Sequence, residues 1–190
     1  LHRDQGFDLI NEALQKELSD FLIDRLKYYM KEKQIRSDII EASVKSFGVD
    51  NLNTIYKKAL NLNNLISKDI GQDIVSGYKR ASNILNSELD KKNIQLSNTT
   101  DPGIFKNDFE KNLLKKINEL RKYFLSINKD EDYRQSLNNL ANAKGVIFEF
   151  FDNVKVNDED QNIKKNRLEL LQMLCKTFDN YISFSIIESN

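Results

Sequence analysis

The chain has 190 residues, of which 39% are hydrophobic and 31% are charged, and its 29 basic and 29 acidic side chains give a formal net charge of zero. This length can hold one sizeable helical domain or two small ones, and the balanced charge argues against a protein that depends on non-specific attraction to nucleic acid. The single cysteine excludes an internal disulfide and fits a reducing compartment. No apolar run approaches the ~20 residues of a membrane span. With one proline and six glycines, the composition predicts an all-α protein.

Apolar residues recur at helical spacing from the beginning of the chain. They predict a long first helix over roughly residues 7–34, with an apolar stripe made of Phe7, Ile10, Leu14, Leu18, Phe21, Leu22 and Leu26. A second helix is predicted to begin at Ser37 or Asp38, because Glu41 follows Asp38 at the spacing of a capping box. Gly48 is the residue at which we expect this helix to end.

A third predicted helix begins at Leu52, and a fourth carries Ile74 on its apolar face. The helical periodicity then fades near residues 93–106. The Asp101-Pro102-Gly103 tripeptide in this stretch predicts a turn, in which proline fixes φ and glycine adopts the left-handed conformation. We predict one helical region over residues 1–190, with this stretch as a long loop and the best place for a subdivision.

Three more helices are predicted in the second half of the chain. Asn107 and Glu110 form the capping box of the fifth helix, the sixth runs from Asp132 to Phe151, and the last begins at Asp158. The fold class predicted from this pattern is a helical bundle of about six or seven helices.

Few side chains in this chain could carry out catalysis. The only histidine is His2, so a Ser-His-Asp or Cys-His site is implausible, and one histidine and one cysteine cannot supply a zinc cluster. Cys175 lies next to Leu174 on the apolar side of the last helix, and we interpret it as a core thiol. The acidic runs 130–132 and 158–160 precede helices, where capping is a better interpretation than acid–base catalysis or metal binding. We therefore predict no catalytic residue, no metal site and no cofactor in this chain.

Two basic clusters could bind RNA. In the first, Lys79, Arg80 and Asn83 fall on one side of the fourth helix, opposite its apolar residues. Lysine and arginine would bind phosphates, and asparagine could read a base edge in an unpaired loop. The alternative interpretation of the same spacing is an ordinary solvated helix face.

The second cluster consists of Lys164, Lys165 and Arg167 in the first turns of the last helix. Cations at this end oppose the helix dipole unless the acidic run before them offsets their charge. Arg167 could contact RNA, or it could pair with Asp152 across the loop and hold the helical hairpin closed. Both interpretations remain open from the sequence.

Three segments, in the same order along the chain, resemble one known family. They are FLIDRLKYYMKEKQIRSDIIEA at residues 21–42, KRASNIL at 79–85, and FFDNV followed by NRLELL between residues 150 and 171. Together they are similar to the C-terminal region of the bacterial glycyl-tRNA synthetase β subunit, with its helical DALR-like anticodon-binding domain. The last motif is shared in looser form with the anticodon-binding domain of arginyl-tRNA synthetase.

The sequence departs from this family at Val146 and Phe148, where the family often carries a proline and an aspartate before the Phe-Phe pair. A contact made by that aspartate is therefore not expected here. Because the chain begins with Leu1, we expect a piece of a longer polypeptide.

The resemblance implies a cytoplasmic, non-catalytic module of glycine–tRNA ligase that binds the anticodon arm of glycine tRNA. It also implies a hetero-tetramer, in which this region joins the rest of the β subunit and a separate α subunit that handles glycine, ATP and Mg²⁺. The alternative function is a helical scaffold for subunit association without RNA contact.

Overall fold

The structure is a computed structural model that describes residues 3–46, 51–92, 95–126 and 133–189, and no strand occurs in these ranges. Gly48 and Asp132, two of the predicted helix boundaries, lie outside the described residues. The elements in chain order are the α-helices α1 (Arg3–Glu32), α2 (Ser37–Ser46), α3 (Leu52–Ile66) and α4 (Asp69–Lys92), the 3-10 helix η2 (Pro102–Ile104), the α-helices α5 (Asp108–Ser126), α6 (Tyr133–Ala141), α7 (Lys144–Asn153) and α8 (Gln161–Tyr181), and the 3-10 helix η3 (Phe184–Ile186). The all-α prediction is confirmed.

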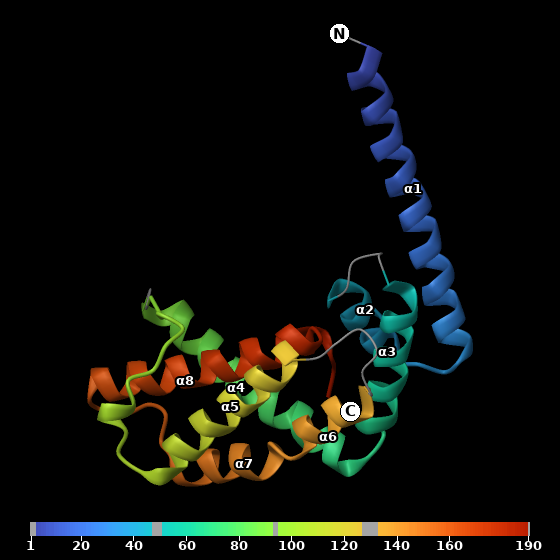
Figure 1. Ribbon diagram of the computed structural model, residues 1–190. Helices are drawn as coiled ribbons and strands as arrows, with labels where there is room; N and C mark the ends of the chain where they lie inside the picture. The colour runs from blue at the N-terminus through green and yellow to red at the C-terminus, as the bar shows by residue number, and fades with distance from the viewer. Residues whose placement is uncertain (1–2, 47–50, 93–94, 127–132, 190) are drawn as a thin grey trace.

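Helices α4 and α8 run antiparallel through the centre of the molecule. The Tyr78 hydroxyl donates a hydrogen bond of 2.8 Å to Asp179 at one end of the pair, and Glu88 forms an ion pair with Lys164 at the other. Helix α5 packs against α7 and α8, and α7 also packs against α4 (Figure 1). The α2–α3 pair lies at the end of the bundle where η3 packs against α2. Because α8 is surrounded by neighbours, it is buried on nearly all sides.

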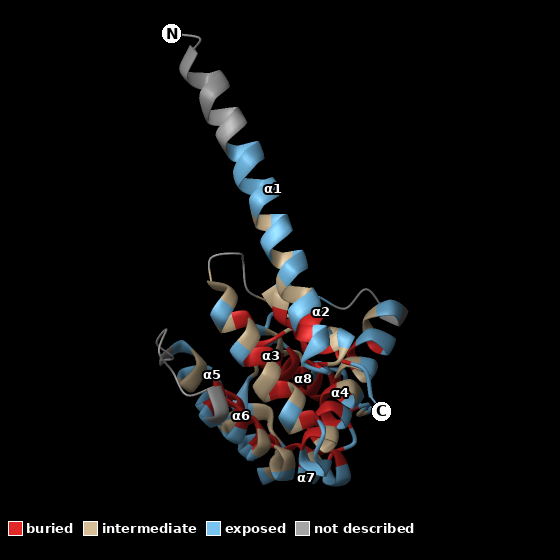
Figure 2. Ribbon diagram, turned by 90° about the vertical axis from the view of Figure 1, so that its right-hand side faces the viewer, coloured by how far each residue is buried: buried red, intermediate tan, exposed pale blue. Residues whose placement is uncertain are grey.

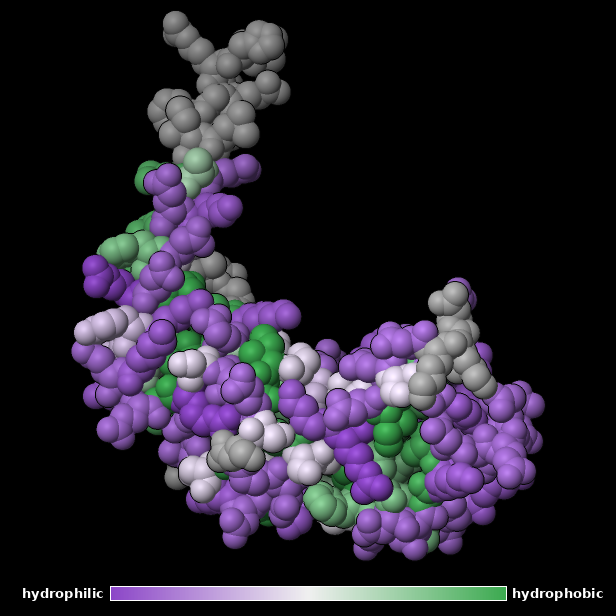
Figure 3. All heavy atoms as spheres, turned by 180° about the vertical axis from the view of Figure 1, so that it is seen from behind, coloured by the Kyte–Doolittle hydropathy of each residue, from purple (hydrophilic) through white to green (hydrophobic). Residues whose placement is uncertain are grey.

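Helix α1 projects away from this bundle (Figures 1 and 2). Its last turns join the core through Met30, which is fully buried, whereas Leu14, Leu18 and Phe21 are 61%, 56% and 55% exposed. The predicted apolar stripe therefore exists, but nothing covers most of its described part. Figure 3 shows hydrophobic surface along that part of α1. The side chains of residues 1–11 lie outside the description.

One of the two predicted capping boxes is present. The Glu110 N–H donates to the Asn107 side chain, and the Asn107 N–H donates to the Glu110 carboxylate, both at 3.1 Å. The box predicted for Asp38 and Glu41 is wrong. Glu41 instead pairs with Lys27 of α1 at 3.0 Å, because α1 and α2 pack together at this point.

The single helix predicted over 132–151 is also wrong, because it is divided into α6 and α7. At the division the N–H of Ala143 donates to the carbonyl of Leu140, three residues back, and this tighter bond ends the α-helical ladder. Ala143 is fully buried, so the change of direction is held in place by packing. The helical spacing of apolar residues in the sequence does not by itself reveal such a break.

The segment at 93–106 runs beside α8 where it is described. Asp101 begins the predicted turn, and its side chain accepts the N–H of Gly103 at 2.8 Å. The left-handed glycine expected there is wrong: no described glycine has a positive φ, and the left-handed residue of this segment is Asn98, at φ 62°. The side chain of Asn166 on α8 accepts the N–H of Asp101 at 2.7 Å and donates to its carbonyl at 3.0 Å. A subdivision at this segment stays a prediction.

Candidate RNA-binding surfaces

The first predicted cluster lies on the outer side of α4. Arg80 and Asn83 are exposed and Lys79 is half-buried, while Tyr78 and Ala81 on the opposite side are buried in the core. This is the arrangement that the spacing of the fourth helix predicted. The structure therefore makes these three polar side chains available at the surface.

Arg80 is partly fixed by the end of α7. Its guanidinium lies over the ring of Phe151, 4.5 Å from the centroid, and donates to the Phe151 carbonyl at 3.4 Å. Such cation–π contacts hold the guanidinium plane without neutralising its charge. Arg80 lines a hollow with Ile84 and with residues 151–157, which form the end of α7 and the start of the α7–α8 connection. Lys79 reaches the other way, to the carbonyl of Ser185 at 3.4 Å.

The three cations of the second predicted cluster differ in how far they are buried. Lys165 is exposed, whereas Lys164 and Arg167 are 8% and 4% exposed. Lys164 forms an ion pair with Glu88 of α4, whose side chain is equally buried. Of the three cations, Lys165 alone is presented to an external partner in this conformation.

Arg167 is the centre of a buried ion cluster. Its Nε donates to Glu110 at 2.7 Å, and its Nη1 donates to Asp158 at 2.7 Å and to the carbonyl of Lys155 at 2.9 Å. The predicted structural role is therefore present, but the predicted partner Asp152 is wrong, because Asp158 and Glu110 take that place. The cluster ties α5, α8 and the α7–α8 connection together. RNA contact by Arg167 stays a prediction.

The acidic run before α8 has two roles. Asp160 is the N-cap, and its side chain accepts the N–H groups of Asn162 at 2.8 Å and Ile163 at 3.4 Å, so Asp158 is not the cap that we predicted. The N–H of Asp160 in turn donates to Asp158 at 3.1 Å. This bond, together with the hydrogen bond and charge of Arg167, lowers the pKa of the Asp158 carboxyl below its usual value.

The two clusters do not form one patch. Because α4 and α8 are antiparallel, Lys79 and Arg80 lie toward the C-terminal end of α8, and Lys165 lies at its N-terminal end. Eight residues of α4 separate Arg80 from Glu88, the partner of Lys164, which is about 12 Å at the rise of an α-helix. A ligand that used both clusters would have to extend along the α4–α8 pair.

The remaining sequence predictions concern chemistry inside the chain. Cys175 is 8% exposed, which confirms the core thiol, and burial together with the nearby charge of Asp179 raises its pKa to about 12. Within the described ranges, no three His, Cys, Asp or Glu side chains gather so that they could hold a metal ion. No helix in these ranges is long and apolar enough to cross a membrane.

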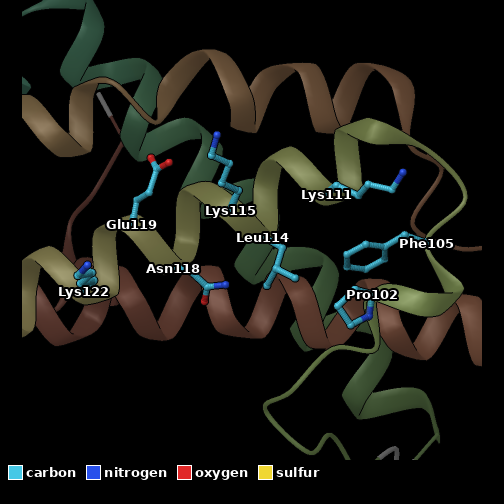
Figure 4. Close-up of a pocket in the computed structure, with 8 residues that line it drawn as sticks. All are labelled: Pro102, Phe105, Lys111, Leu114, Lys115, Asn118, Glu119 and Lys122. Atoms are coloured by element: carbon cyan, nitrogen blue, oxygen red, sulfur yellow. The ribbon is translucent and has the colours of Figure 1, made fainter.

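Sequence reasoning missed a third surface, on α5. Lys111, Lys115 and Lys122 border a hollow whose apolar lining includes Phe105 and Leu114 (Figure 4). A signal was present in the sequence, because positions separated by four and then seven residues share one face of a helix. This signal is weak, because α5 carries many charges of both signs.

Comparison with known proteins identifies the family of this chain. The profile of the DALR anticodon binding domain matches residues 74–186, from α4 to the end of η3. The chain is 29% identical over 174 residues to a glycine–tRNA ligase beta subunit of Cereibacter sphaeroides. The aligned region is 92% of this chain and 25% of that relative. It is 32% identical over 188 residues to the glycine–tRNA ligase beta subunit of Rickettsia africae, and this alignment covers 94% of this chain and 27% of that relative.

The chain thus spans about a quarter of the length of the curated relatives that it matches. The resemblance seen in the three sequence segments is confirmed, since the relatives carry the name of the family that those segments indicated. The profile match covers more than half of the chain and includes most of α4 and all of α5 and α8, the helices that carry the three surfaces described above. The chain therefore belongs to the DALR anticodon-binding domain family.

Proposed function

We propose that the chain is the module of a glycine–tRNA ligase β subunit that binds the anticodon arm of glycine tRNA. The observation that carries this proposal is the match of residues 74–186 to an anticodon-binding domain. The module itself is non-catalytic and works in the cytoplasm. It supports charging of the tRNA within a hetero-tetramer, in which the α subunit supplies the ATP and Mg²⁺ chemistry.

The α4 surface makes the main contact with the tRNA in this proposal. Lys79 and Arg80 bind phosphates, and Asn83 reads a base edge in the unpaired loop. Lys165 adds a phosphate contact further along the α4–α8 pair. Arg167, together with Lys164, holds the start of α8 in place, so the contribution of these two buried cations is to position Lys165 and the neighbouring loop.

Charge reversal tests this assignment. The double variant Lys79→Glu, Arg80→Glu should bind glycine tRNA more weakly in a gel shift. The slope of log affinity against log salt should become shallower by roughly 1.4 to 1.8, because each lost phosphate contact removes about 0.7 to 0.9. The matched control is Lys16→Glu, Lys31→Glu on exposed positions of α1, which changes the net charge equally. If the double variant is folded by circular dichroism and binds with an unchanged slope, the α4 assignment is wrong.

A tRNA with a mutated anticodon separates base reading from backbone binding. Loss of affinity for the mutated tRNA would support recognition of the anticodon. Equal affinity for the two tRNAs would leave only sequence-independent contact with the backbone.

The exposed face of α1 favours a second candidate function, the scaffold role. Leu14, Leu18 and Phe21 are more than half exposed and share one side of the helix, and exposed apolar surface of this kind marks contact sites between proteins. The variant Leu18→Glu, Phe21→Glu should then weaken association with the α subunit in sedimentation experiments while tRNA binding persists. Unchanged association would remove this candidate.

A further inference from the structure

The hollow on α5 has an apolar floor and a basic rim. Its lining joins η2 and the residue that follows it to one face of α5, and its volume is about 520 Å³, within the ~300–1,000 Å³ range of small-ligand sites. In Figure 4, Leu114 lies near the centre of the lining, Phe105 lies at one end beside Pro102 and Lys111, and Lys122 lies at the other end of the row along α5. The residues that line it are Pro102, Phe105, Lys111, Leu114, Lys115, Asn118, Glu119 and Lys122.

Hydrogen bonds hold the backbone before and after Phe105, the aromatic residue of this hollow. The Phe105 N–H donates to the carbonyl of Pro102 at 3.4 Å, as the last bond of η2. On the other side, the Glu110 carboxylate accepts the N–H groups of Lys106 at 2.7 Å and Asn107 at 3.1 Å. Phe105 packs against the core but remains partly exposed. The backbone on both sides of Phe105 is therefore held in place, and its side chain is partly accessible from outside.

The rim carries more positive than negative charge, because Lys111, Lys115 and Lys122 line the hollow with one acidic residue, Glu119, which lies at helix-stabilising spacings from Lys115 and Lys122. Lys111 and Lys115 are four residues apart, and like charges at this spacing destabilise a helix by a few tenths of a kcal/mol. Lys111 is offset by Asp108 at 2.9 Å, and the nearest acidic residue of the rim, Glu119, pairs at 2.8 Å with Lys116, which does not line the hollow. Within the described part of the chain, no ion pair is formed by Lys115 or Lys122.

We propose that this hollow binds one unpaired nucleotide of the tRNA, which rests on the proposed function. The base stacks on Phe105 beside the apolar floor, and Lys115 and Lys122 bind phosphates of the strand as it continues from that base along α5. Asn118 can both donate and accept a hydrogen bond at a base edge. An aromatic ring beside cations is the combination that binds single-stranded nucleic acid, whereas an acidic peptide would need the cations alone.

A neighbouring hollow extends this path along the molecule. It is lined by Lys165, Asn162 and Asn166 of α8, and it includes Asp101, the residue directly before Pro102 of the first hollow. An RNA strand that leaves Phe105 across the Asp101–Pro102 step would meet Lys165. Lys165, the exposed cation of the second predicted cluster, would then bind the same RNA strand as the hollow on α5.

The test uses the whole chain and two kinds of variant. Phe105→Leu keeps an apolar side chain but removes the ring, and it should lower the affinity for glycine tRNA by about five-fold or more, since stacking contributes ~1–3 kcal/mol per base. Lys115→Gln, Lys122→Gln should reduce the salt slope by about 1.4, at ~0.7 per single-stranded phosphate contact.

The controls lie on exposed positions of α1. Tyr28→Leu removes a ring that is 61% exposed, and Lys16→Gln, Lys31→Gln removes two exposed charges. Neither control should change tRNA binding. A tRNA whose anticodon loop is annealed to a complementary DNA strand should lose the effect of Phe105→Leu, because a paired base cannot enter the hollow.

The outcomes distinguish this inference from the proposed function. If wild type binds glycine tRNA and both variants bind it with the same affinity and salt slope, the hollow is not an RNA site and the proposed function stands. If wild type does not bind glycine tRNA, both are wrong. If polyglutamate competes as well as RNA and Phe105→Leu has no effect, the rim binds acidic partners in general and the nucleotide assignment is overturned. The lysine variant carries the test if Phe105→Leu fails to fold, because both lysines are exposed.

Discussion

At the scale of single residues, the buried ion cluster around Arg167 couples helix capping to tertiary packing. Glu110 is 1% exposed, and its two carboxylate oxygens have different tasks: one accepts from Arg167, and the other accepts from the backbone N–H groups that precede α5. A buried carboxylate of this kind is stable only while both sets of donors are present. The start of α5 therefore depends on a side chain of α8.

Replacing Arg167 should destabilise the fold strongly. Arg167→Ala leaves the Glu110 carboxylate buried without its cation, and removal of one partner of a buried pair costs about 3–5 kcal/mol. Urea denaturation followed by circular dichroism measures this change. The matched control is Lys165→Ala, two residues earlier and exposed, for which a change within ~0.5 kcal/mol is expected. An unchanged urea midpoint for Arg167→Ala would mean that the guanidinium is dispensable for the fold.

The sequence could predict that Arg167 has a structural alternative, but it could not identify the partners. Asp158 is nine residues away and was interpreted as a cap, while Glu110 is 57 residues away on another helix. Spacing along one helix reports only neighbours within a few turns. The exposed side of α4 was predictable for the same reason, because Lys79, Arg80 and Asn83 belong to a single helix whose apolar face is regular.

At the scale of elements, the boundaries depend on packing more than on local sequence. The Asn107–Glu110 capping box was readable because both partners lie within four residues. The break between α6 and α7 was not, because the burial of Ala143 decides it. The junction between α3 and α4 depends in the same way on Gly71, since a Cβ there would collide with the backbone of Leu65 and stand 2.6 Å from the Cα of Ile66.

Two glycine-to-alanine variants should therefore have opposite effects. Gly71→Ala forces the end of α3 to move and should destabilise the protein by about 1–3 kcal/mol, the range for overpacking. Gly145→Ala in the first turn of α7 meets nothing within 4 Å and should stabilise it by up to ~1 kcal/mol, because alanine loses less backbone entropy in a helix. Thermal unfolding of both variants beside wild type gives the signs. Equal effects would show that the α3–α4 junction can relax.

At the scale of the whole molecule, the bundle and the projecting α1 have separate roles. The core that joins α2 to η3 includes α1 only through its last turns, while the stripe from Leu14 to Leu22 lies outside it. The sequence could not reveal this, because an apolar stripe has the same period whether another element covers it or not. The family match begins at residue 74, so α1 also lies outside the part of the chain that matches the anticodon-binding domain.

The stability of the bundle should therefore be insensitive to the exposed stripe. Leu18→Glu, Phe21→Glu alters side chains that are 56% and 55% exposed, and glutamate is a good helix former, so a change within ~0.5 kcal/mol per site is expected. Met30→Ala, twelve residues after Leu18 on the same helix, empties a fully buried site and should cost about 2–5 kcal/mol. Urea denaturation of the two variants compares them directly. If the stripe variant lost as much stability as Met30→Ala, α1 would have to be counted as part of the bundle, and its apolar face could no longer be assigned to a partner.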